Sequence, residues 1–406
     1  MSASPITAAV VLASAGLACG QNCAGTSVAE TPLNDLGTGL YLGQFQGGLY
    51  PGGSNSPPAA HSAEGLARAA AVAPLNTLGQ PSAAGKVVLL SVGLSNTTQE
   101  WCSQGSAEPC DPWSFTGRAE LAQDTDHLHL VIVNGAFGGH STSFWDQPTD
   151  PDYDRVRDTV LAPLGLTESQ VQAAWLKEAN PSPTVALPNA NAEAYQLVAQ
   201  HGNMLRAMKA RYPNLRMVFI SSRIYAGYAT STLNPEPYAY ESGFAVKWVI
   251  EAQITQMAGG GVDPRAGDLN YGTVAPWIAW APYLWADGTT PRSDGLTWVC
   301  SDFVSDGTHP SAGTTGGRAK VGSRLLEFFR TSPYTAPWFL AHTGVCYANC
   351  DGSTTAPQLN TTDFTCFLQQ YAGHRTYANC DASTITPYLN TADFTCFLQK
   401  YAAGCS

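Results

Sequence analysis

Three side chains in the sequence stand in settings that suit nucleophilic catalysis: Ser95, Asp306 and His309. Ser95 follows the apolar run VVLLSVG and Leu94, whereas Asp306 and His309 are three residues apart in the loop-like segment SDGTHPS. A serine hydroxyl becomes a nucleophile only when a base removes its proton, and a carboxylate can hold that base in the required tautomer. Together the three would form a Ser-His-Asp triad that attacks an acyl carbon. Taken alone, the D-x-x-H spacing also fits an ordinary surface loop.

The elements that would position these residues alternate between apolar strands and amphipathic helices. Short apolar runs predict strands, and longer segments with one apolar face predict helices. The predicted strands cover 86–93, 127–134 and 215–222, and the predicted helices cover 167–179 (with a capping box at Thr167 and Gln170), 191–212, 243–258 and 319–329. This alternation predicts an α/β domain whose parallel sheet is covered on both faces. Ligands of such sheets bind at the carboxyl ends of the strands, where Ser95 stands.

Four segments, in order along the chain, resemble the sequence blocks of the SGNH (GDSL-type) hydrolase family. They are VLLSVGLSNT with Ser95 as nucleophile, VIVNGAFGGH with Gly139 as a backbone oxyanion donor, AAWLKEANPSP with Asn180 as a side-chain oxyanion donor, and SDGTHPS with Asp306 and His309. Two blocks depart from the family pattern, because Leu94 replaces the Asp of G-D-S and the third block lacks G-x-N-D. The resemblance implies a three-layer α/β/α, flavodoxin-like parallel sheet.

The resemblance also implies a reaction that needs no metal or organic cofactor. His309 would take the proton of Ser95, and the oxyanion would be held by the N–H groups of Ser95 and Gly139 and by the Asn180 amide. Removing one such donor typically costs roughly 10²–10³ in turnover. Two assignments have structural alternatives: Gly139 as a plain turn glycine, and Asn180 as the C-cap of a helix before Pro181.

Aromatic and basic residues near the end of the domain indicate the substrate class. Trp285 lies in the aromatic run WIAWAPYLWADG, and Arg223 and Tyr225 follow the strand segment FISS. Because sugars stack on aromatic rings, Tyr225 and Trp285 are candidate substrate contacts. Arg223 is a third candidate, since its guanidinium could bind an acid or a hydroxyl-rich substrate. The alternatives are core packing for the rings and an internal ion pair for Arg223.

The function we favour from these residues is deacetylation of carbohydrate by a serine esterase, with an ester or acetylated carbohydrate as substrate. A general carboxylesterase or lipase is the alternative among enzymes. A non-catalytic carbohydrate-binding or cell-surface attachment protein on the same fold is the alternative outside them. Nucleic acid is not an expected partner, because the net charge of -11 and the absence of a basic cluster give phosphate groups nothing to bind.

The N-terminus and the cysteines indicate export. Residues 6–18 form an apolar run of signal-peptide length, with cleavage expected after Gly20; a buried N-terminal helix is the alternative. No stretch is predicted to cross a membrane. Loss of Cys19 leaves an even number of cysteines, which is typical of disulfides, and the expected short-range pairs are Cys102–Cys110, Cys350–Cys366 and Cys380–Cys396. We expect a secreted, periplasmic or cell-surface protein.

The C-terminal segment contains two copies of one unit, CYANCDGSTTAPQLNTTDFTCFLQQYAG (346–373) and TYANCDASTITPYLNTADFTCFLQKYAAG (376–404). Two cysteine-bearing copies predict a small disulfide-stapled helical repeat module. The units resemble the dockerin-like, EF-hand-like tails of secreted bacterial proteins, which implies calcium and a docking partner. The candidate ligands are Asn349, Asp351, Asp363, Asn379, Asp381 and Asp393. The alternative is a disulfide-held pair in which Asn349 and Asp351 only cap turns, because Tyr347 and Tyr377 replace the first acidic ligand.

The expected organisation has four parts. Residues 1–20 are a signal peptide, 21–84 a loop-rich N-terminal segment, 85–340 the hydrolase-like catalytic domain and 344–406 the tandem repeats. The N-terminal segment is assigned as loop because Gly, Pro, Ser and Ala dominate it.

Overall fold

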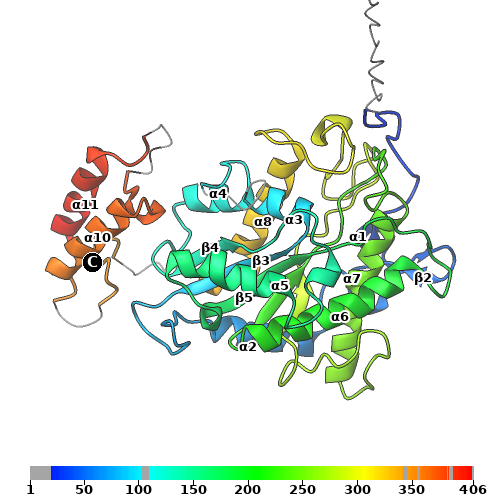
Figure 1. Cartoon of the computed structure of the whole chain (residues 1–406), viewed down its shortest axis with the longest axis horizontal. Helices are drawn as coiled ribbons and strands as arrows, with labels where there is room; N and C mark the ends of the chain where they lie inside the picture. Colours follow the sequence, from blue (N-terminus) through cyan, green and yellow to red (C-terminus); the bar gives the residue numbers. More distant parts are fainter. Residues whose placement is uncertain are drawn as a thin grey trace, which may run out of the picture.

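The computed structural model describes residues 20–102, 109–341, 346–353, 357–381, 383 and 387–404. Within these residues the main feature is a five-stranded parallel sheet in the order β4-β3-β5-β6-β7 (Figure 1). The strands are β3 (Val87–Gly93), β4 (Leu130–Asn134), β5 (Val171–Lys177), β6 (Met217–Ile220) and β7 (Trp277–Trp280). This is the flavodoxin-like 2-1-3-4-5 order, so the predicted fold class is confirmed.

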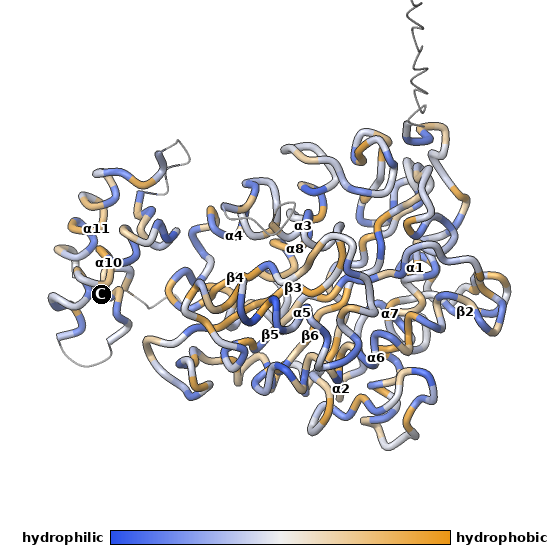
Figure 2. The backbone as a smooth tube through the Cα atoms, viewed as in Figure 1, coloured by the Kyte–Doolittle hydropathy of each residue, from blue (hydrophilic) through white to orange (hydrophobic). Residues whose placement is uncertain are grey.

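The neighbouring strands β3 and β5 are mostly apolar because both of their faces are covered. Every residue of β3 and of β5 is buried, and Figure 2 shows hydrophobic colouring concentrated on the strands. The registers Leu90↔Ala174 and Gly93↔Lys177 hold the two strands side by side up to their carboxyl ends. A sheet buried on both faces favours such continuous apolar runs, which is why the strands predicted over 86–93, 127–134 and 215–222 were recognisable in the sequence.

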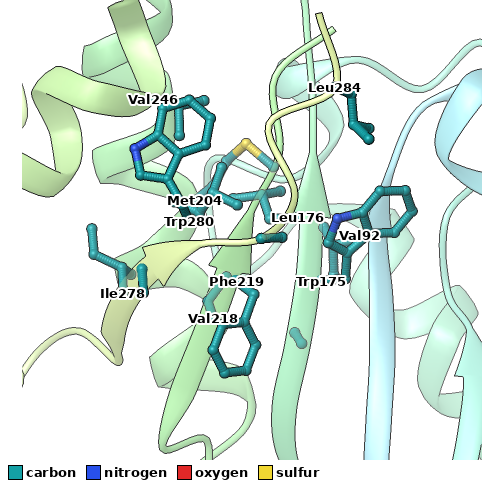
Figure 3. Packing of buried hydrophobic residues seen from close by; sticks show 14 of the residues in the cluster. Val92, Trp175, Leu176, Met204, Val218, Phe219, Val246, Ile278, Trp280 and Leu284 are labelled. Atoms are coloured by element: carbon teal, nitrogen blue, oxygen red, sulfur yellow. The ribbon is translucent and has the colours of Figure 1, made fainter. Parts of the chain in front are cut away.

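Helices cover both faces of the sheet (Figure 1). One face carries α3 (Ser95–Trp101), α4 (Phe115–Leu121) and α8 (Gly317–Thr331), and the other carries α6 (Glu193–Arg211) and α7 (Tyr238–Met257). Trp101 of α3 stacks on Trp175 of β5, with ring centroids 5.4 Å apart. Figure 3 shows Val246 of α7 and Trp280 of β7 together in the buried cluster. The sheet is therefore fixed by large side chains on both sides.

The helix predicted over 167–179 is wrong. The segment forms a 3₁₀ turn at Glu168–Gln170, where the Gln170 side chain accepts a hydrogen bond from the Thr167 N–H, and then the central strand β5. The capping-box residues were correct, but they start a single turn and not a long helix. Because a short apolar run has the same composition in a buried helix and a buried strand, the strand became evident only from its pairing with β3 and β6.

The remaining elements are short, apart from one helix in the segment predicted as loop. That helix is α2 (Ala59–Ala70), whose Gly65 approaches the Trp277 ring so closely that a Cβ there would lie 2.4 Å from it. The others are α1 (Leu33–Leu36), β1 (Leu40–Tyr41), β2 (Phe45–Gln46), α5 (Pro151–Arg155), α9 (Ala336–Phe339), a π-helical turn at Val156–Leu161 and 3₁₀ turns at Pro51–Gly53, Thr142–Phe144, Ala162–Leu164 and Cys300–Asp302.

Disulfides connect distant and neighbouring parts of the chain. Cys102–Cys110, Cys350–Cys366 and Cys380–Cys396 form as predicted. A further bond, Cys23–Cys300, joins residues 277 positions apart. It ties the N-terminal segment to the loop that leads to Asp306.

The two C-terminal repeats build one small core. Helices α10 (Thr361–Ala372) and α11 (Thr391–Ala403) bring Phe367 and Phe397 into a stack with ring centroids 4.2 Å apart. A 3₁₀ turn at Thr376–Ala378 lies between these helices. The hydroxyls of Tyr347 and Tyr377 each donate to the other's backbone carbonyl. The repeats thus fold as a mutually packed pair, as the predicted disulfide-stapled helical module requires.

Across the described residues, no helix is both long and apolar enough to span a bilayer. The predicted signal peptide lies outside the described residues, except for Gly20.

Candidate active site

Ser95 lies at the turn between β3 and α3. Gly93 ends the strand so close to β5 that a Cβ there would lie 2.2 Å from the Lys177 carbonyl oxygen, so only glycine fits. Ser95 is the first residue of α3 and is partly exposed. Because the first N–H groups of a helix have no intrahelical acceptor, the Ser95 N–H points out of the helix end. The hydroxyl and this N–H are therefore presented together at the carboxyl edge of the sheet.

His309 and Asp306 meet Ser95 in one hydrogen-bond chain. The Ser95 Oγ lies 2.7 Å from His309 Nε2, and His309 Nδ1 lies 2.6 Å from Asp306 Oδ2. The His309 side chain is 19% exposed and that of Asp306 is 34% exposed. The three predicted triad residues thus come together at a place that a small molecule can reach from solvent.

The loop that carries Asp306 and His309 is fixed by its own backbone. Asp306 Oδ1 accepts hydrogen bonds from the N–H groups of Thr308 (2.8 Å) and His309 (3.0 Å). Burial raises the pKa of Asp306, but the hydrogen bonds from His309 and Thr308 outweigh it and bring the pKa below its ordinary value. The carboxylate is therefore ionised at neutral pH and orients the imidazole.

Neighbouring elements hold this loop against the nucleophile. The Asn96 Nδ2 group on α3 donates to the Thr308 carbonyl (3.1 Å), and the Thr230 N–H donates to the Asp306 carbonyl (3.1 Å). Gly307 has a φ of +66°, and a Cβ there would lie 1.9 Å from the Tyr228 carbonyl oxygen. The loop can pack this closely only because residue 307 is glycine.

The turn after β4 lies against the turn that carries Ser95, with Gly138 nearest to the serine. The Phe137 N–H donates to the Gly93 carbonyl (3.0 Å), and a Cβ built on Gly138 would lie 3.7 Å from the Ser95 Cβ. Gly139 has a φ of +84°, and its N–H has no acceptor among the described residues. Gly139 thus follows the glycine nearest to Ser95 and has a backbone donor without an acceptor among the described residues, as an oxyanion site needs.

Asn180 lies in the same region, but its amide is engaged. Its Nδ2 group donates to Glu193 Oε1 (2.7 Å) and Gln200 Oε1 (2.6 Å), while its Oδ1 accepts from Thr142 Oγ1 (2.6 Å). Both amide hydrogens already have acceptors, so an oxyanion could bind Asn180 only if one of these bonds were released. The helix C-cap alternative is wrong, because the preceding residues form a strand.

A buried charge cluster beneath the site was not predicted. Lys177 and Glu100 form an ion pair at 2.5 Å with neither side chain exposed. Burial lowers the pKa of Lys177 and raises that of Glu100, while each charge favours ionisation of the other. The pair ties the end of α3 to the end of β5 and so helps to place Ser95. Its one sequence signal was the lysine that ends the largely apolar run of β5.

The three predicted substrate contacts are all buried. Tyr225 donates to the Gly25 carbonyl (2.7 Å) and Trp285 donates to Glu236 (2.8 Å), and both rings are fully buried. A substrate can reach neither ring, so we correct these two assignments: both are core residues. Arg223 is 2% exposed, and none of the described acids lies within ion-pair distance of it, so the internal-pair alternative is also wrong. Burial lowers the pKa of its guanidinium, and the charges of Glu100 and Glu236 partly oppose this.

The candidate calcium ligands in the repeats serve the backbone. Asp363 accepts from the N–H groups of Asp351 (3.2 Å) and Asn360 (2.8 Å), and Asn349 accepts from the Ser353 N–H (3.0 Å). Asn379, Asp381 and Asp393 repeat this pattern. Among the described residues no three acidic, cysteine or histidine side chains gather as a metal site. These bonds match the turn-capping alternative.

Comparisons with known proteins give only weak structural similarities. No family model and no curated protein matches the chain. An extracellular lipase from Streptomyces rimosus matches with a TM-score of 0.28 and 13% identity over 59% of this chain and 99% of the lipase. A putative GDSL-like lipase from Parabacteroides merdae matches with 0.31 and 12% over 62% and 96%, and the salicylyl-acyltransferase SsfX3 of a tetracycline biosynthetic pathway with 0.30 and 15% over 61% and 54%. At these values the similarities assign neither family nor activity.

Proposed function

We propose that the protein is a serine ester hydrolase of the SGNH type, with Ser95 as nucleophile, His309 as general base and Asp306 as the orienting carboxylate. The observation that carries this proposal is the unbroken chain from Ser95 Oγ through His309 to Asp306, with contacts of 2.7 and 2.6 Å. The spacing is within the range over which a base can take a hydroxyl proton directly. These three hydrogen-bonded residues lie at the carboxyl edge of a parallel sheet, and this position supports the proposal.

The proposed reaction uses this geometry. His309 Nε2 takes the Ser95 proton as Oγ attacks the ester carbonyl, and the developing imidazolium is stabilised by the Asp306 carboxylate. The negative oxygen is held by the N–H groups of Ser95 and Gly139, which lie on adjoining turns. His309 then protonates the leaving alcohol, and a water activated by the same imidazole releases the acid. Asn180 joins the oxyanion site only if substrate displaces Glu193 or Gln200 from its amide.

The finer parts of the proposal are an acetylated carbohydrate as substrate and action outside the cytoplasm. The disulfides support export, because such bonds persist in oxidising compartments. We further propose residues 1–20 as signal peptide, 21–84 as a loop-rich N-terminal segment, 85–340 as the catalytic domain and 344–406 as a tail that attaches the enzyme to a partner.

The test uses 4-nitrophenyl acetate with the wild-type chain and two serine variants. Ser95→Ala should lose at least about 10³-fold in kcat, because a triad acts as a unit. Ser305→Ala is the matched control, since this exposed serine precedes Asp306 without belonging to the triad. A fluorophosphonate should label Ser95 in the wild type, as located by peptide mapping. Equal turnover in wild type and Ser95→Ala, or no turnover and no labelling, would refute the hydrolase and leave a binding protein.

A further inference from the structure

The N-terminal arm, residues 21–26, lies directly against the loop that follows β6. The Asn22 N–H donates to the Tyr228 carbonyl (2.9 Å), and a Cβ built on Gly25 would lie 2.1 Å from the Gly227 carbonyl oxygen. Real Cβ contacts are at least 3.0 Å, so the two backbones touch at a place where only glycine fits. The arm therefore supports the backbone around Tyr228.

The Tyr228 carbonyl also touches the catalytic loop. Gly307 is so close that a Cβ there would lie 1.9 Å from the carbonyl oxygen, and the nearby Thr230 N–H donates to the Asp306 carbonyl (3.1 Å). One carbonyl group thus contacts both the arm, through Asn22, and the loop that carries the acid and the base of the triad. Because close-packed groups transmit displacements to their neighbours, a shift of the arm changes the support of this loop.

A disulfide makes a second connection between the arm and the catalytic loop. Cys23 is bonded to Cys300, and Gln21 Nε2 donates to the Cys300 carbonyl (3.0 Å). Cys300 is the first residue of the 3₁₀ turn Cys300–Asp302, from which the chain continues into the catalytic loop. The arm is thereby attached covalently to the start of the segment that it also supports through Tyr228.

This disulfide is more accessible than the other bonds that join described cysteines. Cys23 is exposed and Cys300 is half-buried. Each of the other three bonds contains at least one buried cysteine, namely Cys102, Cys350 or Cys380. Because thiol–disulfide exchange requires a thiolate to reach one of the two sulfurs, a small thiol should reduce Cys23–Cys300 before the others.

We propose that the arm positions the catalytic loop and that the Cys23–Cys300 bond makes this positioning sensitive to thiols. The proposal rests on the proposed ester hydrolase function. A thiolate of a small dithiol attacks the Cys23 sulfur, and Cys300 leaves as a thiolate. The second thiol of the reagent then releases Cys23 and closes the oxidised, cyclic reagent, so both cysteines end as thiols. The arm is afterwards held only by its hydrogen bonds, and the His309 imidazole loses part of its alignment with Ser95.

The expected effect is on turnover. The arm acts on the base through other residues, so its release should change kcat and not substrate binding. Misplacing a catalytic group by 1 Å can cost about 10²-fold, and here the hydrogen bonds of the arm remain. We therefore expect kcat for 4-nitrophenyl acetate to fall about 5–20-fold, with KM changed by less than about 2-fold.

The first test compares two disulfides. Cys23→Ser/Cys300→Ser should show this loss of kcat well below its melting temperature, and the rate at which a fluorophosphonate labels Ser95 should fall in parallel. Cys350→Ser/Cys366→Ser is the matched control, because it removes a bond in the C-terminal repeats, and it should retain kcat. A folded Cys23→Ser/Cys300→Ser enzyme with the kcat of the wild type would overturn the proposal.

The second test leaves both cysteines in place. Gly25→Ala must move the arm until its Cβ is at least 3.0 Å from the Gly227 carbonyl oxygen, whereas a Cβ at Gly261 meets nothing within 4 Å, so Gly261→Ala is the control. Only Gly25→Ala should lose kcat, and equal kcat in the two variants would count against the arm.

Reduction of the wild type tests the thiol sensitivity itself. With dithiothreitol, kcat should fall as iodoacetamide begins to label Cys23 and Cys300, and it should return when an unlabelled sample is reoxidised. Labelling of these two cysteines without loss of kcat, or a loss that follows labelling of other cysteines, would overturn the thiol sensitivity.

Hydrogen exchange tests the positioning without turnover. Peptides covering residues 303–310 should exchange at least about 3-fold faster in Cys23→Ser/Cys300→Ser than in the wild type, and peptides covering 87–93 should not change. Unchanged exchange over 303–310 would overturn the positioning. Faster exchange there in a protein whose wild type hydrolyses no ester would refute the hydrolase and leave the positioning of the loop standing.

Discussion

Gly307 gives the most direct test of how the fold holds the catalytic loop. A Cβ at this position would lie 1.9 Å from the Tyr228 carbonyl oxygen, and real Cβ contacts are at least 3.0 Å, so Gly307→Ala forces a displacement of about 1.1 Å. His309 is two residues away and lies 2.7 Å from Ser95 Oγ. If the backbone displacement at residue 307 is transmitted to the His309 imidazole, it breaks the hydrogen bond to Ser95. Since misplacing a catalytic group by 1 Å can cost about 10²-fold, we expect kcat to fall by about that factor.

The backbone strain of Gly307→Ala must be separated from its steric effect. The left-handed φ of +66° costs an alanine about 1–2 kcal/mol of stability. Gly313→Ala is the matched control, because Gly313 has a φ of +96° and nothing within 4 Å of a Cβ. Both variants should melt earlier by differential scanning calorimetry, but only Gly307→Ala should lose kcat on 4-nitrophenyl acetate well below the melting temperature. A Gly307→Ala enzyme with kcat within 2-fold of wild type would show that the loop geometry does not control the reaction.

Three further predictions concern stability. Lys177→Met leaves Glu100 as an unpaired buried charge and should cost about 3–5 kcal/mol by denaturant unfolding, with recovery in Lys177→Met/Glu100→Leu; an unchanged midpoint in the single variant would contradict the pairing. Burial raises the pKa of Glu241 to about 7 in the folded protein, so the folded state favours the protonated carboxyl. This preference stabilises the folded state fully at acidic pH, and the stabilisation is lost as the pH rises through 7. The melting temperature should therefore fall less between pH 5 and 8 in Glu241→Gln than in wild type, and parallel profiles would count against this assignment. Replacing Cys23 and Cys300 by serine should cost about 2–5 kcal/mol, because their bond closes a loop of 277 residues, and calorimetry with no shift would refute it.

The triad could be predicted from sequence because each of its parts has a local signal. A strand that ends in glycine before a serine, and an acid three residues before a histidine in a glycine-containing loop, are short patterns whose geometry is set by neighbouring residues. The same holds for Gly139, whose turn directly follows β4. No local pattern determines the distance between Ser95 and His309, because that distance depends on the order of the strands in the sheet.

The errors arise where burial decides the outcome. The run 171–177 has the alanines of a helix but becomes a central strand because its neighbours β3 and β6 bury it on both sides. Tyr225 and Trp285 are of residue types that are common in sugar-binding sites, but both are buried in the core.

The crossed tyrosines of the C-terminal repeats have a consequence for how such a tail can change over generations. Each copy completes the other: Tyr347 and Tyr377 exchange hydrogen bonds, and Phe397 covers Phe367. Deleting either copy would expose the apolar residues of the remaining copy to water. Once such a duplication is established, loss of a single copy is therefore unfavourable. We expect lineages to gain or lose the tail two units at a time.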